Sequence, residues 1–392
     1  MHVAVSGWFW NRPETGSGQY VQQLVRALPE VDPALKLTVV LPQAPTTLAS
    51  TSSHLKFVVH PTPLSNLRKV WWEQVWMPRF AARVRADLLH IPYWAPPIAS
   101  SLPCVVTIHD IIPLVLRAYR GDFRVRLYTS FVAAATPCTS MILTDSDAAR
   151  EDIIEHLKVA ADLIRTVPLA AQDIYTHVPA PADEEMRESL ALPRRYVLYL
   201  GGFDARKNLK TLFEAFSIAH EAGIEAKLVV GGRLPSADTP FTPDPRGLAR
   251  EAGVSEDAVC FLGFVPEQAA PAVYRGAHTF VFPSVYEGFG LPPLEALSCG
   301  VPVVGSAATS IPEVVGAAGV LLDPDDAEGM AGALIQLLND DAFHVELRRR
   351  ALEQAKRFDW QRTAKATLAA YQATLSQGLG WKAPGAQTAA PK

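Results

Sequence analysis

The stretch YVLYLGGFDARKN, residues 196–208, decides the fold of this chain. An apolar run leads directly into Gly201 and Gly202, and two adjacent cations, Arg206 and Lys207, follow. A short apolar run that enters a turn and then a helix is typical of a buried parallel strand in a doubly wound sheet. The two glycines clear space above the end of that strand, where an anion can approach the backbone.

The same alternation of apolar runs and helix-like stretches occupies both halves of the chain. Residues 170–193 separate the halves; they are polar and rich in proline, so we expect a linker with one short helix there. The pattern predicts an α/β protein with two Rossmann-like, doubly wound parallel-sheet domains that face a cleft. Beyond the amino-terminal strand, the expected strands lie at residues 37–41, 57–59, 88–91, 105–108, 141–144, 196–200, 227–230, 259–262, 280–283 and 301–304.

Composition excludes several classes of protein. The net charge of −4 gives no global basic field for nucleic acid, and no apolar run is long enough for a signal peptide or a membrane span. The four cysteines form no CxxC pair and fit no zinc frame, so they are expected as buried thiols in a reducing compartment. We therefore expect a soluble cytoplasmic protein. Peripheral contact with the inner face of the plasma membrane stays open.

Two further loops carry groups suited to a phosphorylated ligand. The stretch TGSGQY, residues 15–20, brings Gly16 and Gly18 to the start of a helix, although a simple tight turn is an equally good reading. At residues 201–208, Gly202 precedes two cations at a helix start. Cations oppose the helix dipole there, so their placement indicates an anionic ligand such as a diphosphate.

The third loop is EGFGLPPLE, residues 287–295, after an apolar run and at the start of a helix. The backbone amides of Phe289, Gly290 and Leu291 could face a phosphate and a sugar. Glu287 and Glu295 lie eight positions apart, and each can accept hydrogen bonds from a pair of hydroxyls, one on the sugar and one on the ribose. Two surface glutamates around a capped helix are the plainer alternative.

The ordered set of loops resembles glycosyltransferase family 4, the group 1 transferases with the GT-B fold. Glu287 and Glu295 with the intervening Gly-Phe-Gly-Leu-Pro match that family's E-x7-E signature, and residues 201–208 match its phosphate loop. Further segments are similar to the family, namely residues 88–92, 107–110 and 144–146. The resemblance extends over nearly the whole chain. The Gly16–Gly18 loop departs slightly from the family pattern.

The resemblance implies roles for individual residues. Arg206 and Lys207 would hold the diphosphate, Glu287 the sugar hydroxyls and Glu295 the ribose. Other groups would contact the donor: His109, Gly16, Gly18, Gly202, Phe289, Gly290 and Leu291. In domain terms, residues 1–169 would form the acceptor-side domain and 194–359 the nucleotide-sugar domain. Residues 360–377 would form a helix that either closes the second domain or crosses back to the first, and residues 378–392 a disordered tail.

The implied activity is retaining transfer of a hexose from a nucleotide-diphosphate sugar to a glycan or lipid-linked acceptor. A faint likeness to bacterial mannosyl- and rhamnosyl-type transferases favours GDP-mannose. No cofactor is expected beyond the nucleotide sugar, which is a co-substrate. Two alternatives stay open: a nucleotide-sugar epimerase of the same fold, and a non-catalytic relative of the transferases.

Two other patterns have simpler explanations. The D-x-D strings at residues 145–147 and 323–325 precede helix-like stretches, so helix capping explains them better than a metal site. The basic and aromatic segment at residues 68–85 could lie on an anionic membrane. A helix with tryptophans on the sheet and arginines in solvent is the favoured reading, because Pro78 interrupts its amphipathic face.

Overall fold

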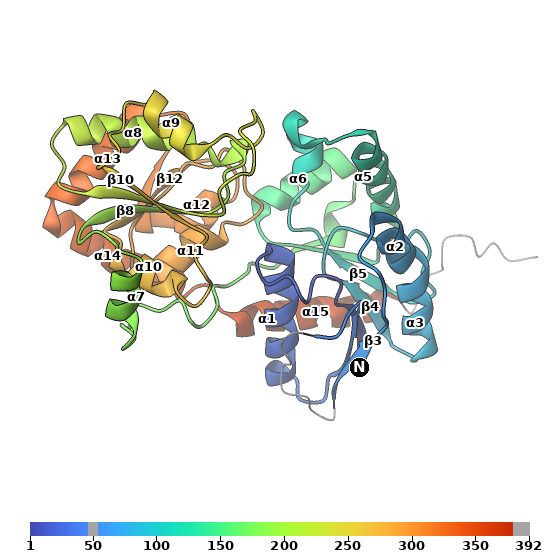
Figure 1. Ribbon diagram of the computed structural model, residues 1–392. Helices are drawn as coiled ribbons and strands as arrows, with labels where there is room; N and C mark the ends of the chain where they lie inside the picture. The colour runs from blue at the N-terminus through green and yellow to red at the C-terminus, as the bar shows by residue number, and fades with distance from the viewer. Residues whose placement is uncertain (46–53, 379–392) are drawn as a thin grey trace, which may run out of the picture. The chain divides into compact units, whose positions relative to one another are not determined.

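The computed structural model describes residues 1–45 and 54–378, which form two compact units. Unit 1 contains residues 1–169 and the segment from Asp359 onward, and unit 2 contains residues 170–358 (Figure 1). The expected linker thus belongs to unit 2. Of the expected disordered tail, residues 379–392 lie outside the described residues, and Gly378 ends a helix.

Within the described residues, unit 1 is built on a seven-stranded sheet with the order β3-β2-β1-β4-β5-β6-β7. Every neighbouring pair is parallel. The strands β4, β5 and β6 are buried at every position, which explains why their sequences, apart from His90, are largely apolar rather than alternating. The strands are β1 His2–Ser6, β2 Lys36–Leu41, β3 Leu55–Val59, β4 Leu88–Ile91, β5 Cys104–Thr107, β6 Met141–Thr144 and β7 Ile164–Thr166.

Several helices of unit 1 begin at side chains that accept hydrogen bonds from free amides of the first turn. Thr15, Ser65, Asp122 and Ser146 cap α1, α2, α5 and α6 in this way. The helical segments are α1 Gly16–Val31, α2 Asn66–Trp71, η1 Trp72–Trp76, α3 Met77–Arg83, α4 Ile112–Val115, η2 Arg117–Tyr119, α5 Phe123–Ala135, η3 Thr136–Cys138, α6 Asp147–Leu157, η4 Ala161–Leu163 and α15 Trp360–Gly378.

The basic and aromatic segment forms one continuous helix through α2, η1 and α3. Pro78 has no amide to bond the preceding turn, and the π-helical turn η1 lies just before it. Trp72 is fully buried and stacks on Trp76 with ring centroids 4.8 Å apart, whereas the arginines of α3 are exposed. Trp72 therefore packs into the core of unit 1, whereas the arginines of α3 face solvent and Trp71 is 39% exposed.

Buried hydrogen bonds fasten α15 to the sheet of unit 1. The Tyr371 hydroxyl and Nδ1 of His90 share a hydrogen bond of 2.7 Å, and Nε2 of His90 and Oγ1 of Thr107 share one of 2.9 Å. The Thr107 hydroxyl in turn bonds the hydroxyl of Tyr20 in α1 over 3.0 Å. Burial lowers the pKa of His90 to about 3, so its neutral ring can accept on one nitrogen and donate on the other. The carboxy-terminal helix is thus part of unit 1.

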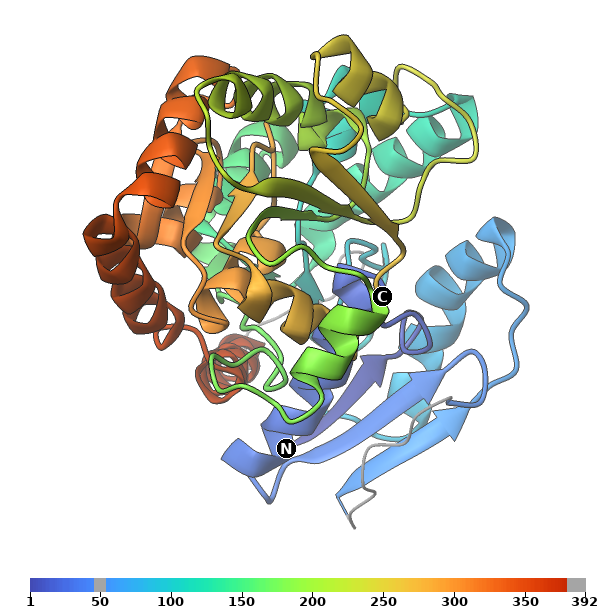
Figure 2. The ribbon, with the colours of Figure 1, turned by 60° about the vertical axis from the view of Figure 1, so that its left-hand side comes forward.

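Unit 2, all of which is described, has a six-stranded parallel sheet with the order β10-β9-β8-β11-β12-β13 and helices on both faces (Figures 1 and 2). Its strands are β8 Tyr196–Leu200, β9 Lys227–Gly231, β10 Val259–Gly263, β11 Thr279–Phe282, β12 Val303–Ser306 and β13 Gly319–Leu322. Its helical segments are α7 Asp183–Ser189, η5 Ala205–Lys207, α8 Leu209–Glu221, α9 Pro245–Glu251, α10 Ala270–Gly276, α11 Leu291–Ser298, α12 Ile311–Val315, η6 Gly316–Ala318, α13 Ala327–Asn339 and α14 Asp341–Ala355.

The expected pair of doubly wound parallel sheets is confirmed. Two edge strands, β7 and β13, were missed because they are short and partly exposed. β12 begins two residues later than expected, after Pro302, which has no amide to donate. Strand order reverses between β1 and β4 in unit 1 and between β8 and β11 in unit 2, so the carboxyl ends of these strands are where ligands are expected.

Candidate active site

The loops that follow β8 and β11 lie together in unit 2. These strands are parallel neighbours, with Thr279 opposite Val197 and Phe280 opposite Leu198. Their carboxyl ends therefore meet at one edge of the sheet, at its point of reversal. A backbone hydrogen bond joins the loops directly, since the Val285 amide donates to the Arg206 carbonyl over 2.8 Å. The sequence stretches 201–208 and 287–295 are thus brought together.

Glu287 lies between the two predicted cations. Its Oε2 is 2.7 Å from Nη1 of Arg206, and its Oε1 is 2.6 Å from Nζ of Lys207. Arg206 also pairs with Asp204 through Nε at 3.1 Å, and Lys207 lies 4.9 Å from the ring centroid of Phe282. The two cations belong to the 3₁₀ turn η5, ahead of α8 rather than inside it. The two cations thus face two carboxylates, those of Glu287 and Asp204, and the four formal charges sum to zero.

The surroundings keep Glu287 ionised. Burial acts to raise the pKa of Glu287, but the charges of Lys207 and Arg206 outweigh burial and lower it. Its backbone is held as well: the Glu287 amide donates to Thr309 Oγ1 over 3.0 Å, and Ser310 Oγ donates to the Glu287 carbonyl over 3.0 Å. Sequence reasoning missed Thr309 and Ser310, because nothing in their local pattern indicates a contact 22 residues away.

The segment after Glu287 has the backbone expected for an anion site. Gly290 has φ of +112° and is the residue before α11; a Cβ there would lie 2.9 Å from Ile311 Cδ1, so glycine is required. Leu291 is the first residue of α11, and Phe289 packs edge-on against Phe358. The amides of Phe289, Gly290 and Leu291 therefore belong to the start of a helix, where amides lack intrahelical acceptors.

Glu295 has a very different environment from Glu287. It lies one turn into α11, is only 8% exposed, and accepts from the Tyr274 hydroxyl over 3.0 Å. Burial raises the pKa of Glu295 to about 8, against hydrogen bonds from Tyr274 and Tyr175 that act to lower it. The protonated form thus predominates at neutral pH. Sequence reasoning identified Glu295 but not the two tyrosines around it.

His109 lies in unit 1, two residues after β5. Its Nδ1 is 2.7 Å from Oδ2 of the buried Asp145, and its Nε2 is buried as well. Tyr20 packs edge-on against the imidazole, with centroids 4.9 Å apart. Burial acts to lower the pKa of His109, but the charge and hydrogen bond of Asp145 raise it overall. Asp145 and a backbone hydrogen bond at Pro92 therefore hold the imidazole in place beyond the end of β5.

The predicted glycines have distinct environments. Gly16 and Gly18 lie inside the first turn of α1, not in a loop before it. A Cβ on Gly18 would lie 1.9 Å from the Arg12 carbonyl oxygen, so that glycine permits a close backbone approach, whereas Gly16 borders open space. A Cβ on Gly202 would meet only Asp204, at 3.4 Å. Packing alone therefore explains Gly18 and leaves Gly16 the better contact for a ligand.

The D-x-D strings have local structural roles. Ser146 caps α6 and Asp326 caps α13, so the capping residues lie within or beside the strings but are not the predicted aspartates. Asp145 pairs with His109, and Asp323 accepts from the Asp325 amide over 3.0 Å. Residues 1–45 and 54–378 contain no group of three or more His, Cys, Asp or Glu side chains placed to hold a metal ion.

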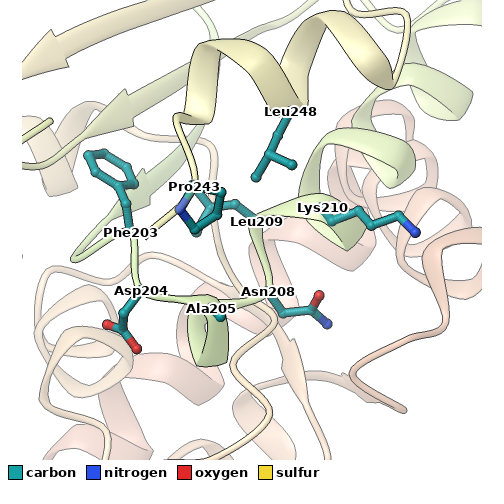
Figure 3. Close-up of a pocket in the computed structure, with 8 residues that line it drawn as sticks. All are labelled: Phe203, Asp204, Ala205, Asn208, Leu209, Lys210, Pro243 and Leu248. Atoms are coloured by element: carbon teal, nitrogen blue, oxygen red, sulfur yellow. The ribbon is translucent and has the colours of Figure 1, made fainter. Parts of the chain in front are cut away.

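A pocket of about 160 Å³ lies beside the loop that follows β8 (Figure 3). Its interior is formed by apolar side chains such as Phe203, Leu209 and Leu248, and the polar ends of Asn208 and Lys210 turn away from it (Figure 3). Asp204, which pairs with Arg206, also lines this pocket, whereas Arg206, Lys207 and Glu287 do not. The pocket therefore adjoins the charged cluster without containing it.

Family models match both halves of the chain. "Glycosyltransferase Family 4" matches residues 15–171, and "Glycosyl transferases group 1" matches residues 182–358. The O-antigen chain mannosyltransferase B of Escherichia coli is 37% identical over 270 residues, which cover 68% of this chain and 70% of that protein. The serotype-specific mannosyltransferase WbdA of Escherichia coli is 31% identical over 66% of this chain, but the match spans only 32% of that longer protein.

Solved structures agree on the architecture. Sucrose-phosphate synthase from Thermosynechococcus elongatus superposes with a TM-score of 0.71 at 22% identity, covering 96% of this chain and 99% of that one. Anabaena HepE in complex with UDP-glucose gives 0.69 at 19% identity, covering 94% and 99%. Two Rossmann-like units of this kind are the GT-B architecture. The chain belongs to the group 1 glycosyltransferases of family 4.

No helix within residues 1–45 and 54–378 is long and apolar enough to cross a membrane.

The raised pKa of Glu295 predicts how stability varies with pH. The carboxyl ordinarily titrates near 4.5 but near 8 in the folded protein, so it takes up a proton on folding, and its contribution to stability is lost as the pH rises through this window. Relative to Glu295→Gln, the free energy of unfolding of the native protein should fall by roughly 1.4 kcal/mol per pH unit there. Denaturant titrations across the window measure this, with the exposed Glu328→Gln as control. Parallel curves for the native protein and Glu295→Gln would contradict the assignment.

The pairing of His109 with Asp145 predicts a change in the titration of the imidazole. In Asp145→Asn the attraction that raises the pKa of His109 is lost and burial still lowers it, so the pKa should fall below the ordinary value. NMR titration of the His109 ring checks this, and Asp147→Asn, whose carboxylate bonds Thr166 instead, is the matched control. An unchanged His109 pKa in Asp145→Asn would show that Asp145 does not govern the charge on this ring.

Proposed function

We propose that this glycosyltransferase moves a hexose, with retention of configuration, from a nucleotide-diphosphate sugar to a hydroxyl of a glycan or lipid-linked acceptor in polysaccharide biosynthesis. The observation that carries the proposal is the cluster of Arg206, Lys207 and Glu287 beside the amides at the start of α11. It combines donors for a diphosphate with an acceptor for sugar hydroxyls within two joined loops.

The cluster suits the departure of a nucleotide diphosphate. Arg206 and Lys207 place two positive charges side by side, and charge-assisted hydrogen bonds to phosphate oxygens are the strong contacts that a diphosphate requires. Holding the cations on one carboxylate sets their positions before the donor binds, which favours stabilisation of the charge that develops on the diphosphate. The amides of Phe289, Gly290 and Leu291 add uncharged donors directed at the same anion.

Glu287 and Glu295 are proposed to divide the donor between them. Glu287 stays ionised and accepts from hydroxyls of the sugar, whereas Glu295, held by Tyr274, contacts the ribose. The protonated carboxyl of Glu295 can both donate and accept, which suits a vicinal pair of hydroxyls. Gly202 lets phosphates approach the backbone after β8.

In unit 1 we propose that His109 contacts the donor sugar through Nε2 and that Gly16 and Gly18 contact the phosphates. The glycosyl–phosphate bond breaks first, and the electron pair stays on the diphosphate. The acceptor hydroxyl then attacks the anomeric carbon from the side that the diphosphate leaves, and its proton passes to a phosphate oxygen. The configuration is thereby retained.

The favoured donor is GDP-mannose. This choice rests on the names of two relatives, both of which are mannosyltransferases. The HepE structure is named as a complex with UDP-glucose, so a uridine donor is the comparison to include. We further propose that the enzyme acts in the cytoplasm, with peripheral contact at the inner face of the plasma membrane. We also propose that it requires no cofactor or metal.

The charged cluster makes a prediction about nucleotide binding. Arg206→Ala and Lys207→Ala should each weaken binding of GDP or UDP by roughly 1.5–3 kcal/mol, because each removes a charge-assisted hydrogen bond. Glu287→Gln is the matched variant: it removes a carboxylate that competes with the diphosphate for the same cations, so nucleotide affinity should hold while turnover falls. Calorimetry with free nucleotide and initial rates with GDP-mannose and UDP-glucose measure both effects.

Glu295→Gln completes this comparison, since it should weaken the binding of free nucleotide and of the intact donor alike. Unchanged nucleotide affinity in both cation variants would remove the diphosphate from this cluster. Loss of nucleotide affinity in Glu287→Gln but not in Glu295→Gln would reverse the roles of the two glutamates. Donor consumption without transfer to any acceptor would favour the epimerase instead.

Transfer should also persist in excess EDTA, because Arg206 and Lys207 supply the positive charge that a metal supplies elsewhere. The measurement is the initial rate before and after chelation. Complete loss of activity that magnesium or manganese restores would contradict this proposal and favour a metal site at the D-x-D strings.

A further inference from the structure

Helix α5 turns large apolar side chains toward solvent. Phe123 is 69% exposed and Leu127 is 60% exposed. They lie four residues apart and so occupy one face of the helix, with Arg124 and Arg126 exposed on either side. We call these four residues the α5 stripe. Isolated exposed apolar residues are ordinary, but two on one helical face between two arginines indicate a contact surface.

The stripe is presented by a firmly held helix. In the second half of α5, Val132 and Ala135 are buried, and Trp94 Nε1 donates to Thr136 Oγ1 just beyond the helix, over 3.0 Å. These contacts hold the carboxyl end of α5 against unit 1. The first half of α5 continues from this packed end, so the exposure of the α5 stripe follows from how the helix packs.

A buried ion pair holds the middle of α5. Tyr128 donates to Oε2 of the fully buried Glu73 over 3.0 Å, and Lys69 pairs with Oε1 of Glu73 at 2.8 Å. Lys69 also donates to the Tyr128 hydroxyl over 3.0 Å, so α2 and α5 are neighbours (Figure 1). Tyr128 follows Leu127 directly, so its hydrogen bonds to Glu73 and Lys69 fix the rotation of α5 that turns the α5 stripe toward solvent.

The charge around the stripe selects an anionic partner. Arg117 and Arg120 lie just before α5 and are exposed, which brings the number of arginines in residues 117–127 to four. Asp122 is the one acidic residue in this range, and its carboxylate accepts from the amides of Arg124 and Val125 as the helix cap. A second copy of this chain docked through the same face would place arginines against arginines, which disfavours self-association.

We propose that the α5 stripe docks on an anionic lipid surface, with Phe123 and Leu127 entering the interface and the arginines contacting lipid phosphates. The proposal rests on the proposed function only through its lipid-linked acceptor and membrane contact. It places that contact on the first two turns of α5 and not on residues 68–85, where Trp72 is fully buried and stacks on Trp76.

The test is sedimentation of the full chain with vesicles of phosphatidylcholine alone or mixed with phosphatidylglycerol. The native protein should bind the mixed vesicles and release in high salt. Arg124→Gln with Arg126→Gln should weaken partitioning by about fivefold for each arginine removed. Phe123→Ser with Leu127→Ser should weaken it by roughly tenfold or more, since two apolar side chains lose their burial.

Two matched controls locate the contact. Arg79→Gln with Arg83→Gln removes two exposed arginines from α3, and Val345→Ser removes an exposed apolar residue of unit 2; both should bind as the native protein does. The α5 variants should keep their rate with a water-soluble acceptor, so failure of the docking proposal is distinguishable from failure of the proposed chemistry. Equal binding to both vesicles, retained binding in the α5 variants, or a dimer that the α5 variants dissociate would each overturn the proposal.

Discussion

The site depends on the carboxylate of Glu287 held between two cations. An ionised side chain with 11% exposure is stable only when it is paired and hydrogen-bonded, and Arg206 and Lys207 supply that pairing from a different loop. The ion cluster therefore ties the loop after β8 to the loop after β11 at the reversal point of the sheet. Thr309 and Ser310 complete the arrangement by bonding the backbone of Glu287. Positively charged side chains next to a helix start are tolerated because they have this partner.

The two glutamates of the E-x7-E pattern show how one residue type acquires two states. Glu287 and Glu295 are both largely shielded from solvent, yet the pKa of one is lowered and that of the other raised. The difference comes from their neighbours, two cations for Glu287 and uncharged tyrosines for Glu295. Burial alone would raise the pKa of both. A single site thus contains a permanent negative charge and a neutral hydrogen-bonding carboxyl a few residues apart.

The sequence predicted the architecture well because parallel strands are buried on both faces and read as short apolar runs. Edge strands such as β7 and β13 lack that signal, since they are brief and half exposed. At the site, the loops were found from glycines and charges that neighbour one another in sequence. The pairing of Asp145 with His109 was missed, as were Tyr274 and Ser310, because these roles arise from contacts with residues 21 to 36 positions away. Such pairings depend on strand order, which local patterns do not encode.

The bond from Tyr371 to His90 has a consequence for the order in which the protein is built. Unit 2 is one continuous stretch of chain, whereas unit 1 needs α15, which is synthesised after all of unit 2. When residues 1–169 have left the ribosome, Nδ1 of His90 still lacks Tyr371, and the side of α1 that packs on α15 is still uncovered. Domains generally fold as units while the chain grows, and here the amino-terminal one stays open until α15, which follows unit 2, has been synthesised. The domain that starts first is therefore the last to be completed.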